Sequence, residues 1–474
     1  MTAVRVESVL AWGGVVGGGA PGGGAAALAL AAAGVGVAIV DESTRLAGAA
    51  GAELRAAGVR CFPDTAVWGV AERGATLLAQ TSGGERPLRL RAESTLIATG
   101  ASERVDPFPG WQLPGVVTAG FARRLAALDR VAVGGVAVVA GSGPALLSTA
   151  CALLDIGTRV AAVVEWHRPH RMRPDLLPAL AQAAGSARVL ARLAWLRGHG
   201  VRIEQGMRVL SATGADRVGS VRIGPVSGGG GEPATRHVRE IAADALCIGH
   251  GVLPSTELAR LLGCQMRWDV MVGAWLPVVD EHGAGSVDGV YLAGSVTGTM
   301  GRRAAIGQGR RAASAMAHWL RPTARAGRAR MAILAIRRTG RPDRRYPAVP
   351  IVVAGLPRDT VVCRCEAVTA GQIRAAAASG GTDLAGVRAL TRAGMGPCQG
   401  RQCGPAVAAV ANLARPVGGP GAGTEPEATA DPDVVAGADV PGEFAVRMPI
   451  RPVPIAALLA LGALGPSRDG GEWG

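Results

Sequence analysis

Four cysteines in the last quarter of the chain have the residue type and spacing of ligands to a metal cluster. Cys363 and Cys365 are one residue apart, 32 residues follow, and Cys398 and Cys403 are then separated by four. Four thiolates are the ligand number of a [2Fe-2S] cluster, which carries single electrons. The short C-x-C span predicts a bent loop at the iron, because on a regular strand both side chains would share one face.

Four glycines surround the second cysteine pair, at positions 394, 396, 400 and 404. They would let backbone N–H groups approach the sulfur atoms, and such hydrogen bonds raise the reduction potential of a cluster. Three arginines, Arg364, Arg392 and Arg401, could partly offset the charge of about −2 on an oxidised cluster with four thiolates. The segment between the pairs, residues 370–394, is predicted to be helical from its small and apolar spacing.

Two other uses of these thiols stay open. Structural zinc also takes four cysteines, but its sites usually place two to four residues within each pair, and the C-x-C half does not. A redox disulfide is disfavoured because the chain has no C-x-x-C. The remaining cysteines stand singly in apolar or mixed segments and are predicted to be small buried hydrophobic residues: Cys61, Cys151, Cys247 and Cys264.

A one-electron cluster needs an electron source, and the front of the chain carries a dinucleotide-binding pattern. Gly17, Gly19 and Gly22 form G-x-G-x-x-G ahead of a small-residue helix. The first glycine allows a tight turn, the second lets the backbone approach a pyrophosphate, and the third packs the helix on the strand. Asp41, followed by Glu42, comes 24 positions after Gly17, where an acceptor for ribose hydroxyls is expected.

A second strand–loop–helix unit follows near residue 136. Gly141 and Gly143 repeat the first two glycines, Leu146 takes the third position, and Glu165 again comes 24 positions after the first glycine. Two such units, each closed by a carboxylate, predict two dinucleotide sites. Glu165 favours an unphosphorylated ribose, because a carboxylate repels a 2′-phosphate. The pattern leaves NAD(P) and another adenine nucleotide such as ATP open at this second site.

Two further strands are predicted to end in glycine, at residues 95–100 and 290–295. Gly100 and the pair Gly294 and Ser295 mark these ends, where the chain leaves one domain for another. The order predicts an α/β protein with two Rossmann-like domains, in which an FAD domain is split by an inserted NAD-type domain. A helix at residues 302–320 would aim its N-terminal dipole at the flavin or the pyrophosphate. A small helical [2Fe-2S] domain follows.

Composition disfavours nucleic acids and membranes as partners. The net charge is +14 and every basic residue is Arg, but these residues are scattered and only 3% of residues are aromatic. The N-terminus lacks the order of a signal peptide. Residues 22–40 are uncharged, yet their Gly/Ala-rich start after a glycine loop predicts a buried helix and strand, not a membrane span. We therefore expect a cytoplasmic chain.

Several of these segments together resemble a known family. Residues 1–320 resemble flavoprotein reductases with two dinucleotide-binding domains. The segments "ASERVDPFPGWQLPGV", "GSGPALL" and "TRAGMGPCQGRQC" are similar to the FAD and [2Fe-2S] α subunits of opine oxidase, hydrogen cyanide synthase and amino-acid dehydrogenase complexes. The cysteine spacing resembles the small ferredoxin domain named after bacterioferritin-associated ferredoxin.

The resemblance and the segment order together predict the parts of the chain. They are an FAD-binding domain at 1–125 and 266–320, an NAD(P)-type domain at 126–265, a linker at 321–357, a [2Fe-2S] domain at 358–415, a disordered linker at 416–445 and a C-terminal tail at 446–474. Three departures from the family pattern stand out. No Gly-Gly-Gln follows Asp41, Ser295 replaces the usual Asp, and Pro21 lies one place later than usual.

The resemblance implies an electron-relay subunit rather than a complete enzyme. A separate FAD-dependent β subunit of the D-amino-acid or sarcosine oxidase type would oxidise the substrate, and a small ferredoxin-like γ subunit could complete the complex. Two alternatives stay open. One is a free-standing NAD(P)H-dependent reductase that feeds electrons through the cluster, and the other is a non-enzymatic docking or iron-handling module on a degenerate flavoprotein scaffold.

Overall fold

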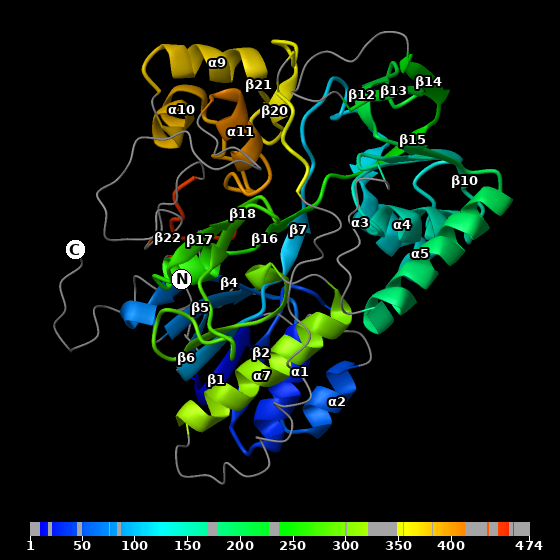
Figure 1. Ribbon diagram of the computed structural model, residues 1–474. Coiled ribbons are helices and arrows are strands. Elements are labelled where there is room, and N and C mark those ends of the chain that lie inside the picture. Colours follow the sequence, from blue (N-terminus) through cyan, green and yellow to red (C-terminus); the bar gives the residue numbers. More distant parts are fainter. Residues whose placement is uncertain are drawn as a thin grey trace, which may run out of the picture.

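The computed structural model divides the chain into three units and a C-terminal segment (Figure 1). The structure describes residues 10–17, 21–44, 50–74, 76–82, 87–168, 179–226, 237–298, 301–320, 348–353, 355–381, 383–412, 434–435, 444–454 and 458. Among these residues, no helix is both long enough and apolar enough to cross a bilayer.

The first unit is built on a sheet whose described strands run in the order β3-β2-β1-β6-β5-β4, with β19 also paired to β6. The strands are β1 (Leu10–Gly17), β2 (Val37–Val40), β3 (Arg60–Phe62), β4 (Thr65–Ala71), β5 (Thr76–Thr81), β6 (Pro87–Ile97) and β19 (Val290–Leu292). β19 pairs in parallel with β6, and Val290 lies opposite Thr95. The two glycine-ended segments predicted from the sequence are therefore neighbours in one sheet.

Helices α1 (Pro21–Ala32) and α7 (Arg302–Leu320) lie side by side on one face of this sheet, with α2 (Ala50–Ala56) next to them (Figure 1). Leu30, Ile39, Leu96 and Met316 are fully buried in the core between them. Residues 22–40 thus form a buried helix and strand, which confirms their prediction. A small sheet of β17 (Met266–Asp269), β18 (Ala274–Pro277) and β22 (Val434–Val435) adjoins this unit.

The second unit has a parallel sheet whose described strands run in the order β11-β10-β9-β15-β8. The strands are β8 (Val116–Thr118), β9 (Val136–Gly141), β10 (Arg159–Glu165), β11 (Arg202–Gln205) and β15 (Ala245–Gly249). Around it lie α3 (Ala119–Arg124), α4 (Ala145–Leu154), α5 (Ala179–Gly198) and the antiparallel strands β12 (Met207–Thr213), β13 (Ser220–Pro225) and β14 (Arg239–Ala242). The expected second strand–loop–helix pattern is present.

The boundaries of the second unit differ from the expected 126–265. Strand β8 pairs with β15, so residues before 126 already belong to this sheet. On the other side, Cys264 packs in the core of the first unit. The two chain crossings between the units are β7 (Ala101–Glu103) and β16 (Val252–Pro254), which pair antiparallel. Strand pairing therefore places the insertion between these crossings, because a sheet strand belongs with the sheet that satisfies its hydrogen bonds.

The third unit is small and helical, as predicted. It contains β20 (Val361–Cys363), β21 (Val368–Thr369), α9 (Ala370–Ala378), α10 (Leu384–Thr391) and α11 (Gly404–Val410). Thr369 and Gln372 form a capping box at the start of α9, and Asp383 caps α10. The predicted helical stretch 370–394 is thus two helices, because a new N-cap at Asp383 starts the second.

The C-terminal segment corrects one expectation. Most of residues 416–445, expected to be a disordered linker, lies outside the described residues, but Val434 and Val435 pair with β17 and Phe444 is buried in the third unit. Ile450 is buried in the core of the first unit. Residues 444–454 therefore lie between two units of the chain.

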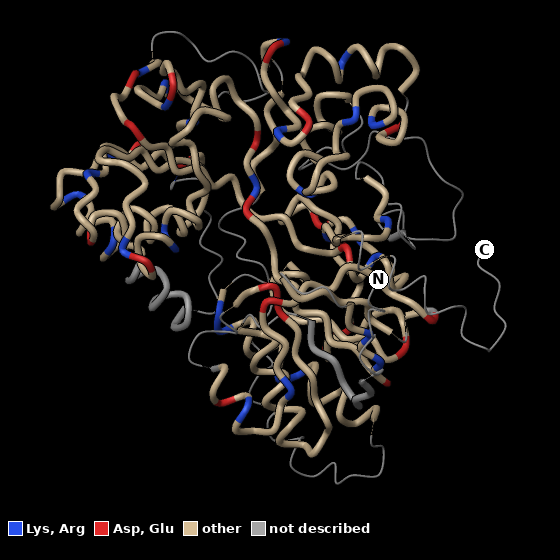
Figure 2. Tube along the Cα trace, turned by 180° about the vertical axis from the view of Figure 1, so that it is seen from behind, with Lys and Arg blue, Asp and Glu red and all other residues tan. Residues whose placement is uncertain are grey.

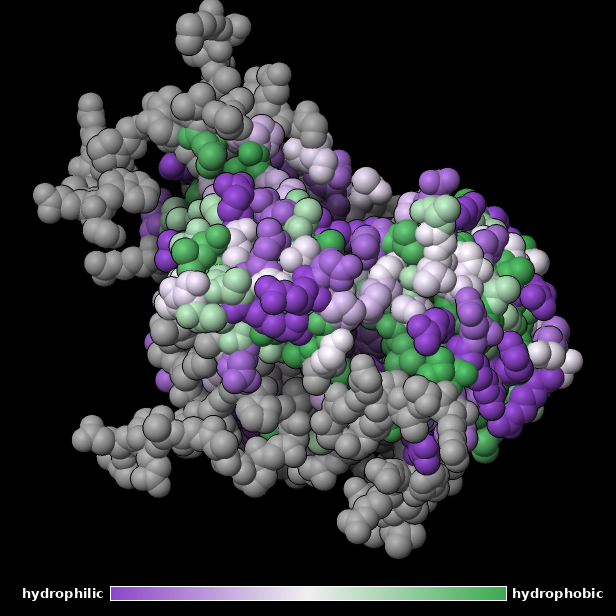
Figure 3. All heavy atoms as spheres, turned by 90° about the horizontal axis from the view of Figure 1, so that it is seen from above, coloured by the Kyte–Doolittle hydropathy of each residue, from purple (hydrophilic) through white to green (hydrophobic). Residues whose placement is uncertain are grey.

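Surface charge follows no single stripe on the described residues. In Figure 2, basic and acidic residues are interspersed along the described part of the chain. Figure 3 looks down on the second and third units and shows polar and apolar residues intermixed on this face. The arginines that are scattered along the sequence are thus also dispersed in space over the part of the chain that the structure describes.

Candidate cofactor sites

The third unit places the four predicted cluster ligands on neighbouring segments. Cys363 ends β20, Cys365 lies in the turn that follows, and Cys403 lies directly before α11, with Cys398 in the preceding turn. The bent loop expected at the C-x-C pair is confirmed. All four are free thiols, of which Cys363 and Cys403 are buried and Cys365 is exposed.

The four thiols face one another. The Cys403 thiol hydrogen-bonds to the thiols of Cys363 and Cys398, and the Cys365 thiol hydrogen-bonds to that of Cys398. Within the described ranges, no three or more Cys, His, Asp or Glu residues are arranged as a site for one metal ion. A [2Fe-2S] cluster spreads its four cysteines over two irons, so it needs a wider set than a tetrahedral zinc site. Four cysteine thiols are the donor set that a [2Fe-2S] cluster takes.

Backbone N–H groups point at the sulfur atoms. Gly394 donates its N–H to Sγ of Cys363 at 3.5 Å, and Gly400 and Gln402 donate theirs to Cys398. Hydrogen bonding from Cys403 is the largest cause that lowers the pKa of Cys363 to about 6 and the pKa of Cys398 to about 5. Thiolate is the form that binds iron.

The other two thiols hold their protons more tightly. Hydrogen bonding to Cys363 and Cys398 raises the pKa of Cys403, whereas burial is the main cause that raises the pKa of Cys365. Binding of iron therefore displaces protons from this set, since metal ligation requires the deprotonated thiolates.

Glycines near the four thiols leave room for neighbouring side chains. A Cβ on Gly396 would overlap the Cβ of Cys365, and a Cβ on Gly394 would lie 2.6 Å from the ring of Phe444. Gly394 has a φ of 78° and Gly400 a φ of 81°, in the left-handed region that favours glycine. The thiols, the N–H donors and these glycines together fit a [2Fe-2S] cluster.

The third unit contacts the second through the strand that leads to Cys363. The Trp111 indole N–H donates to the carbonyl of Val361 at 2.6 Å. The Arg364 guanidinium lies over the Trp111 ring, 5.7 Å from its centroid. Arg364, expected only to offset cluster charge, thus also contacts the neighbouring unit, and no pattern along the chain indicates this partner.

The first glycine loop connects β1 to α1 as predicted. Gly17 ends β1 and Gly22 lies in the first turn of α1, while Gly19 is outside the described residues. Gly22 packs against α7 rather than the strand, since a Cβ there would lie 3.1 Å from the carbonyl oxygen of Ala305. The start of α1 presents N–H groups without partners inside the helix, which suit a pyrophosphate.

The two acidic residues after β2 differ in their partners. Asp41 accepts the N–H of Ser43 on Oδ1 at 2.7 Å, in a turn at the end of the strand. Glu42 is exposed and accepts from Nε of Arg451 at 2.5 Å. Asp41 is therefore the better placed of the two for a ribose, because the Glu42 carboxylate is engaged by the C-terminal segment.

Gly294 and Ser295 lie in a short 3₁₀ turn between β19 and α7. The N–H of Gly294, which has a φ of 84°, donates to Oε1 of Gln308 at 2.9 Å. The Thr297 hydroxyl donates to the Gly294 carbonyl at 2.8 Å. Gln308 in α7 thus fixes this turn, a role that sequence reasoning missed, although a glutamine between two glycines in a small-residue helix is a visible signal.

Gly100 also lies at a unit crossing. Its φ is 76°, and its carbonyl accepts the N–H of Ser255 at 3.0 Å. The hydroxyl of Thr99 donates to the carbonyl of Ser255 at 2.6 Å. The predicted domain-exit glycine therefore lies where the outgoing chain is hydrogen-bonded to the returning chain.

The second glycine loop is closed by its own carboxylate. Glu165 accepts the N–H of Gly143 on Oε2 at 3.0 Å and the N–H of His167 on Oε1 at 3.1 Å. Gly141 has a φ of 139°, and a Cβ there would overlap the carbonyl of Gly249. The predicted residues thus lie together, and the turn requires glycine at 141.

Substitution Glu165→Gln is expected to remove a pH dependence of stability. Burial raises the pKa of Glu165 from 4.5 to about 7, although both N–H donors lower it. Between these pH values the folded chain binds a proton that the unfolded chain releases, so this contribution is full below about pH 4.5 and lost by about pH 7. As the pH rises from about 4.5 to about 7, the thermal unfolding midpoint of the wild type should fall relative to that of the variant. Parallel curves would contradict the burial of this carboxylate.

Comparisons with known proteins give two family matches along the chain. Residues 14–317 match the pyridine nucleotide-disulphide oxidoreductase model, and residues 361–412 match the BFD-like [2Fe-2S] binding domain. The HcnB subunit of hydrogen cyanide synthase from Pseudomonas protegens is 31% identical over 428 residues, which cover 82% of this chain and 89% of that protein. An opine oxidase subunit of Rhizobium meliloti is 32% identical over 487 residues, covering 94% of this chain and 87% of that protein.

A solved structure aligns with most of this chain. L-proline dehydrogenase from P. horikoshii aligns with a TM-score of 0.65 at 20% identity, over 96% of this chain and 81% of that one. This likeness shows the fold. The chain belongs to the pyridine nucleotide-disulphide oxidoreductase family, in the branch of HcnB and the matching opine oxidase subunits, and it is an FAD/NAD-dependent oxidoreductase with a [2Fe-2S] cluster.

Proposed function

We propose that this chain is the electron-transfer α subunit of a heteromeric dehydrogenase that acts on an amine, an amino acid or an opine. Its relatives of 31% and 32% identity are both named as subunits, and the alignments cover most of each protein. The observation that carries the proposal is the joining of a flavin-type unit to a four-thiol unit within one chain. Arg401 of the thiol loop contacts both Glu257 and the carbonyl of Ile450, which belong to the other side of that junction.

The division of labour follows from the chemistry of the two groups. When bound, a flavin accepts two electrons as hydride and releases them singly, which a one-electron cluster can receive. The chain supplies the N–H groups at the start of α1 for the pyrophosphate and the Asp41 carboxylate for the ribose. It supplies Cys363, Cys365 and the second cysteine pair as iron ligands.

The three units take the following roles in this proposal. The first unit, from the N-terminus to β7 and from β16 to α7, is the FAD-binding domain. The second unit, between β7 and β16, is the NAD(P)-type or other adenine-nucleotide domain, and the third is the [2Fe-2S] domain. The proposed substrate-oxidising partner is an FAD-dependent β subunit of the D-amino-acid or sarcosine oxidase type, and a small ferredoxin-like γ subunit is a further member.

The test is to purify the chain anaerobically, alone and together with an oxidase-type protein encoded beside it. We expect the chain alone to contain flavin, iron and sulfide but to leave amines, amino acids and opines unreacted. With the partner, substrate should bleach the flavin band and give the EPR signal of a reduced cluster. Full substrate turnover by the isolated chain would overturn the proposal.

A free-standing NAD(P)H reductase is the second candidate, and the second unit favours it. Gly141 and Glu165 there form the turn and the carboxylate of a dinucleotide site. This candidate predicts rapid dye reduction by NADH with the isolated chain and no need for a partner. Slow NADH oxidation together with partner-dependent cluster reduction would exclude it.

A further inference from the structure

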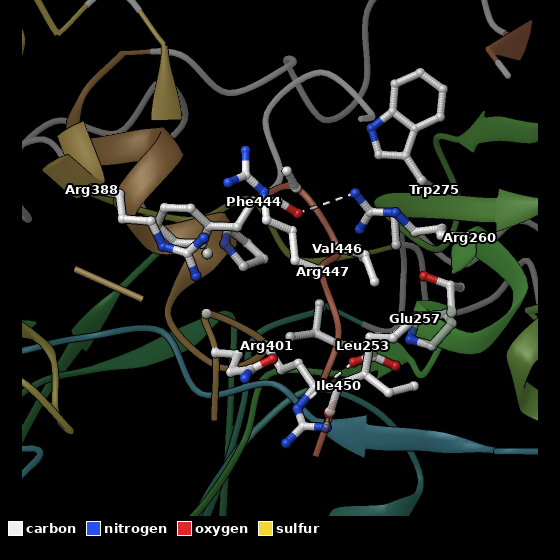
Figure 4. Close-up of a pocket in the computed structure, with 18 of the residues that line it drawn as sticks. Leu253, Glu257, Arg260, Trp275, Arg388, Arg401, Phe444, Val446, Arg447 and Ile450 are labelled. Atoms are coloured by element: carbon white, nitrogen blue, oxygen red, sulfur yellow. Dashed lines mark hydrogen bonds and ion pairs between the residues drawn. The ribbon is translucent and has the colours of Figure 1, made fainter. Parts of the chain in front are cut away.

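A C-terminal segment, Phe444–Arg451, runs between the first and third units, and we call it the strap. It lines a cavity of about 380 Å³ together with residues of both units (Figure 4). Figure 4 shows the strap passing between Arg388 and Arg401 on one side and Arg260 and Glu257 on the other. Residues 444 and 445 were expected to belong to the disordered linker and residues 446–451 to the C-terminal tail, so the contacts of this segment with both units were not predicted.

One end of the strap is buried against the cluster loops. Phe444 is buried, and its ring fills the space left by Gly394 and Gly400. Arg388 places its guanidinium over this ring, 4.9 Å from the centroid, and Arg260 donates to the Phe444 carbonyl at 3.1 Å. The ring therefore covers the side of the cluster loops that faces the first unit.

The other end is anchored in the first unit. Ile450 is buried there, and its N–H donates to the carbonyl of Trp68 at 2.7 Å. The N–H of Val70 donates to the sulfur of Met448 at 3.2 Å, and Arg451 pairs with Glu42, the neighbour of the ribose candidate Asp41. The strap thus joins the cluster loops to the flavin-type unit at two separate places.

Arg401 lies between Cys398 and Cys403 and contacts the Cys398 loop, the strap and the first unit. Its Nε donates to the carbonyl of Cys398 at 3.1 Å, and its Nη1 donates to the carbonyl of Ile450 at 3.0 Å. Nε also lies 3.8 Å from Oε1 of Glu257 in α6 (Glu257–Leu261). A planar fork can bind a cluster-loop carbonyl and a strap carbonyl at once, which an ammonium group does less well.

We propose that Arg401 is a positioning residue for electron transfer: it locks the Cys398 loop to the strap and so fixes the cluster relative to the flavin. This inference rests on the proposed relay function. The rate of electron transfer falls as two redox groups move apart, so a lock that fixes the two units relative to each other has a measurable effect. The positive charge of Arg401 also acts on the cluster potential, and a control variant that removes a nearby charge separates this effect from positioning.

The experiment compares Arg401→Gln, Arg401→Lys and the matched control Arg447→Gln in the full chain loaded with FAD and cluster. Arg447 is exposed on the strap and lines the same cavity, so its substitution removes the same charge there while the Arg401 bonds to the carbonyls of Cys398 and Ile450 stay in place. Iron content and the EPR line shape establish that the cluster is intact. The rate of cluster reduction after photoreduction of the flavin, the cluster midpoint potential and amide exchange of residues 444–454 are then measured.

We expect Arg401→Gln to slow cluster reduction by about tenfold and to speed exchange of the Ile450 amide by about tenfold. Arg401→Lys should recover part of both effects, and Arg447→Gln should match the wild type. A rate loss accounted for by a changed midpoint potential, or an unchanged Ile450 amide, would overturn the proposal.

A truncation after residue 443 keeps the test decisive if a point variant loses its cluster. In the truncated chain, Arg401→Gln should cause no further slowing, because its partner carbonyl is gone. Additive effects would contradict an action through the strap. If the wild-type chain shows no transfer from flavin to cluster, the relay function fails, whereas amide exchange still decides whether Arg401 holds the strap.

Discussion

Replacing Cys398 with alanine is expected to abolish the [2Fe-2S] cluster while leaving the flavin bound. Cys398 is the thiol that hydrogen-bonds to both Cys403 and Cys365, so it links the two cysteine pairs. Three thiolates leave one iron with an open position, and a cluster missing one ligand is lost or degraded. The iron and sulfide contents of the purified chain should fall at least about tenfold, and the EPR signal after reduction should disappear.

The matched control is Cys61→Ala, which removes a thiol from the first unit. Cys61 is half-buried in β3, and burial raises its pKa, as expected for a thiol without a metal-binding role. Its variant should keep iron, sulfide and flavin at wild-type levels. A Cys398→Ala chain with full iron, or a wild-type chain with zinc in place of iron, would remove the basis of the electron-relay function.

The cysteine site could be predicted from sequence because its chemistry is local. Iron requires four thiolates, and each pair lies within six residues, so the spacing alone limits the ligand sets. The glycines around Cys398 were visible as well, but the space that Gly394 and Gly400 leave is filled by the Phe444 ring, a residue far along the chain that the spacing did not indicate. The glycine turns at Gly141 and Gly294 were likewise visible, because only glycine takes their φ angles without strain.

Contacts between distant segments could not be predicted in this way. The pair formed by Glu42 and Arg451 joins residues 409 positions apart, and no local pattern marks either partner. Trp111 was recognised only as part of a family segment, whereas the structure shows its indole bonded to the strand before Cys363. Such contacts depend on how the units pack, which periodicity along the chain does not encode.

The start of the second unit was misplaced for a related reason. Strand β8 has only three residues, and it pairs at the edge of a sheet whose other strands come later in the chain. A three-residue strand has too few positions to show an alternating or a buried pattern.

The burial of the four single cysteines was predicted only in part. Cys247 and Cys264 are buried as predicted, whereas Cys61 and Cys151 are half-buried.

The junction between α1 and α7 explains why glycines recur on both helices. Gly309 in α7 faces Gly22 in α1, and a Cβ on Gly309 would overlap the carbonyl oxygen of Gly22 and lie 2.9 Å from its carbonyl carbon. Both contacts are with backbone, so no side-chain movement can relieve them. The helix α1 would have to move, and its first turn carries the N–H groups assigned to the pyrophosphate.

Gly309→Ala is therefore expected to lower the free energy of unfolding by about 3 kcal/mol and to reduce the FAD content severalfold. The control is Gly198→Ala at the end of α5, where an added Cβ meets nothing within 4 Å and where alanine should stabilise the helix by up to ~1 kcal/mol. Thermal unfolding and the flavin absorbance of the purified chains measure both effects. Loss of stability with full FAD content would contradict the link between this helix contact and the pyrophosphate site. It would mean that the chain accommodates the added Cβ beside Gly22 without moving the first turn of α1.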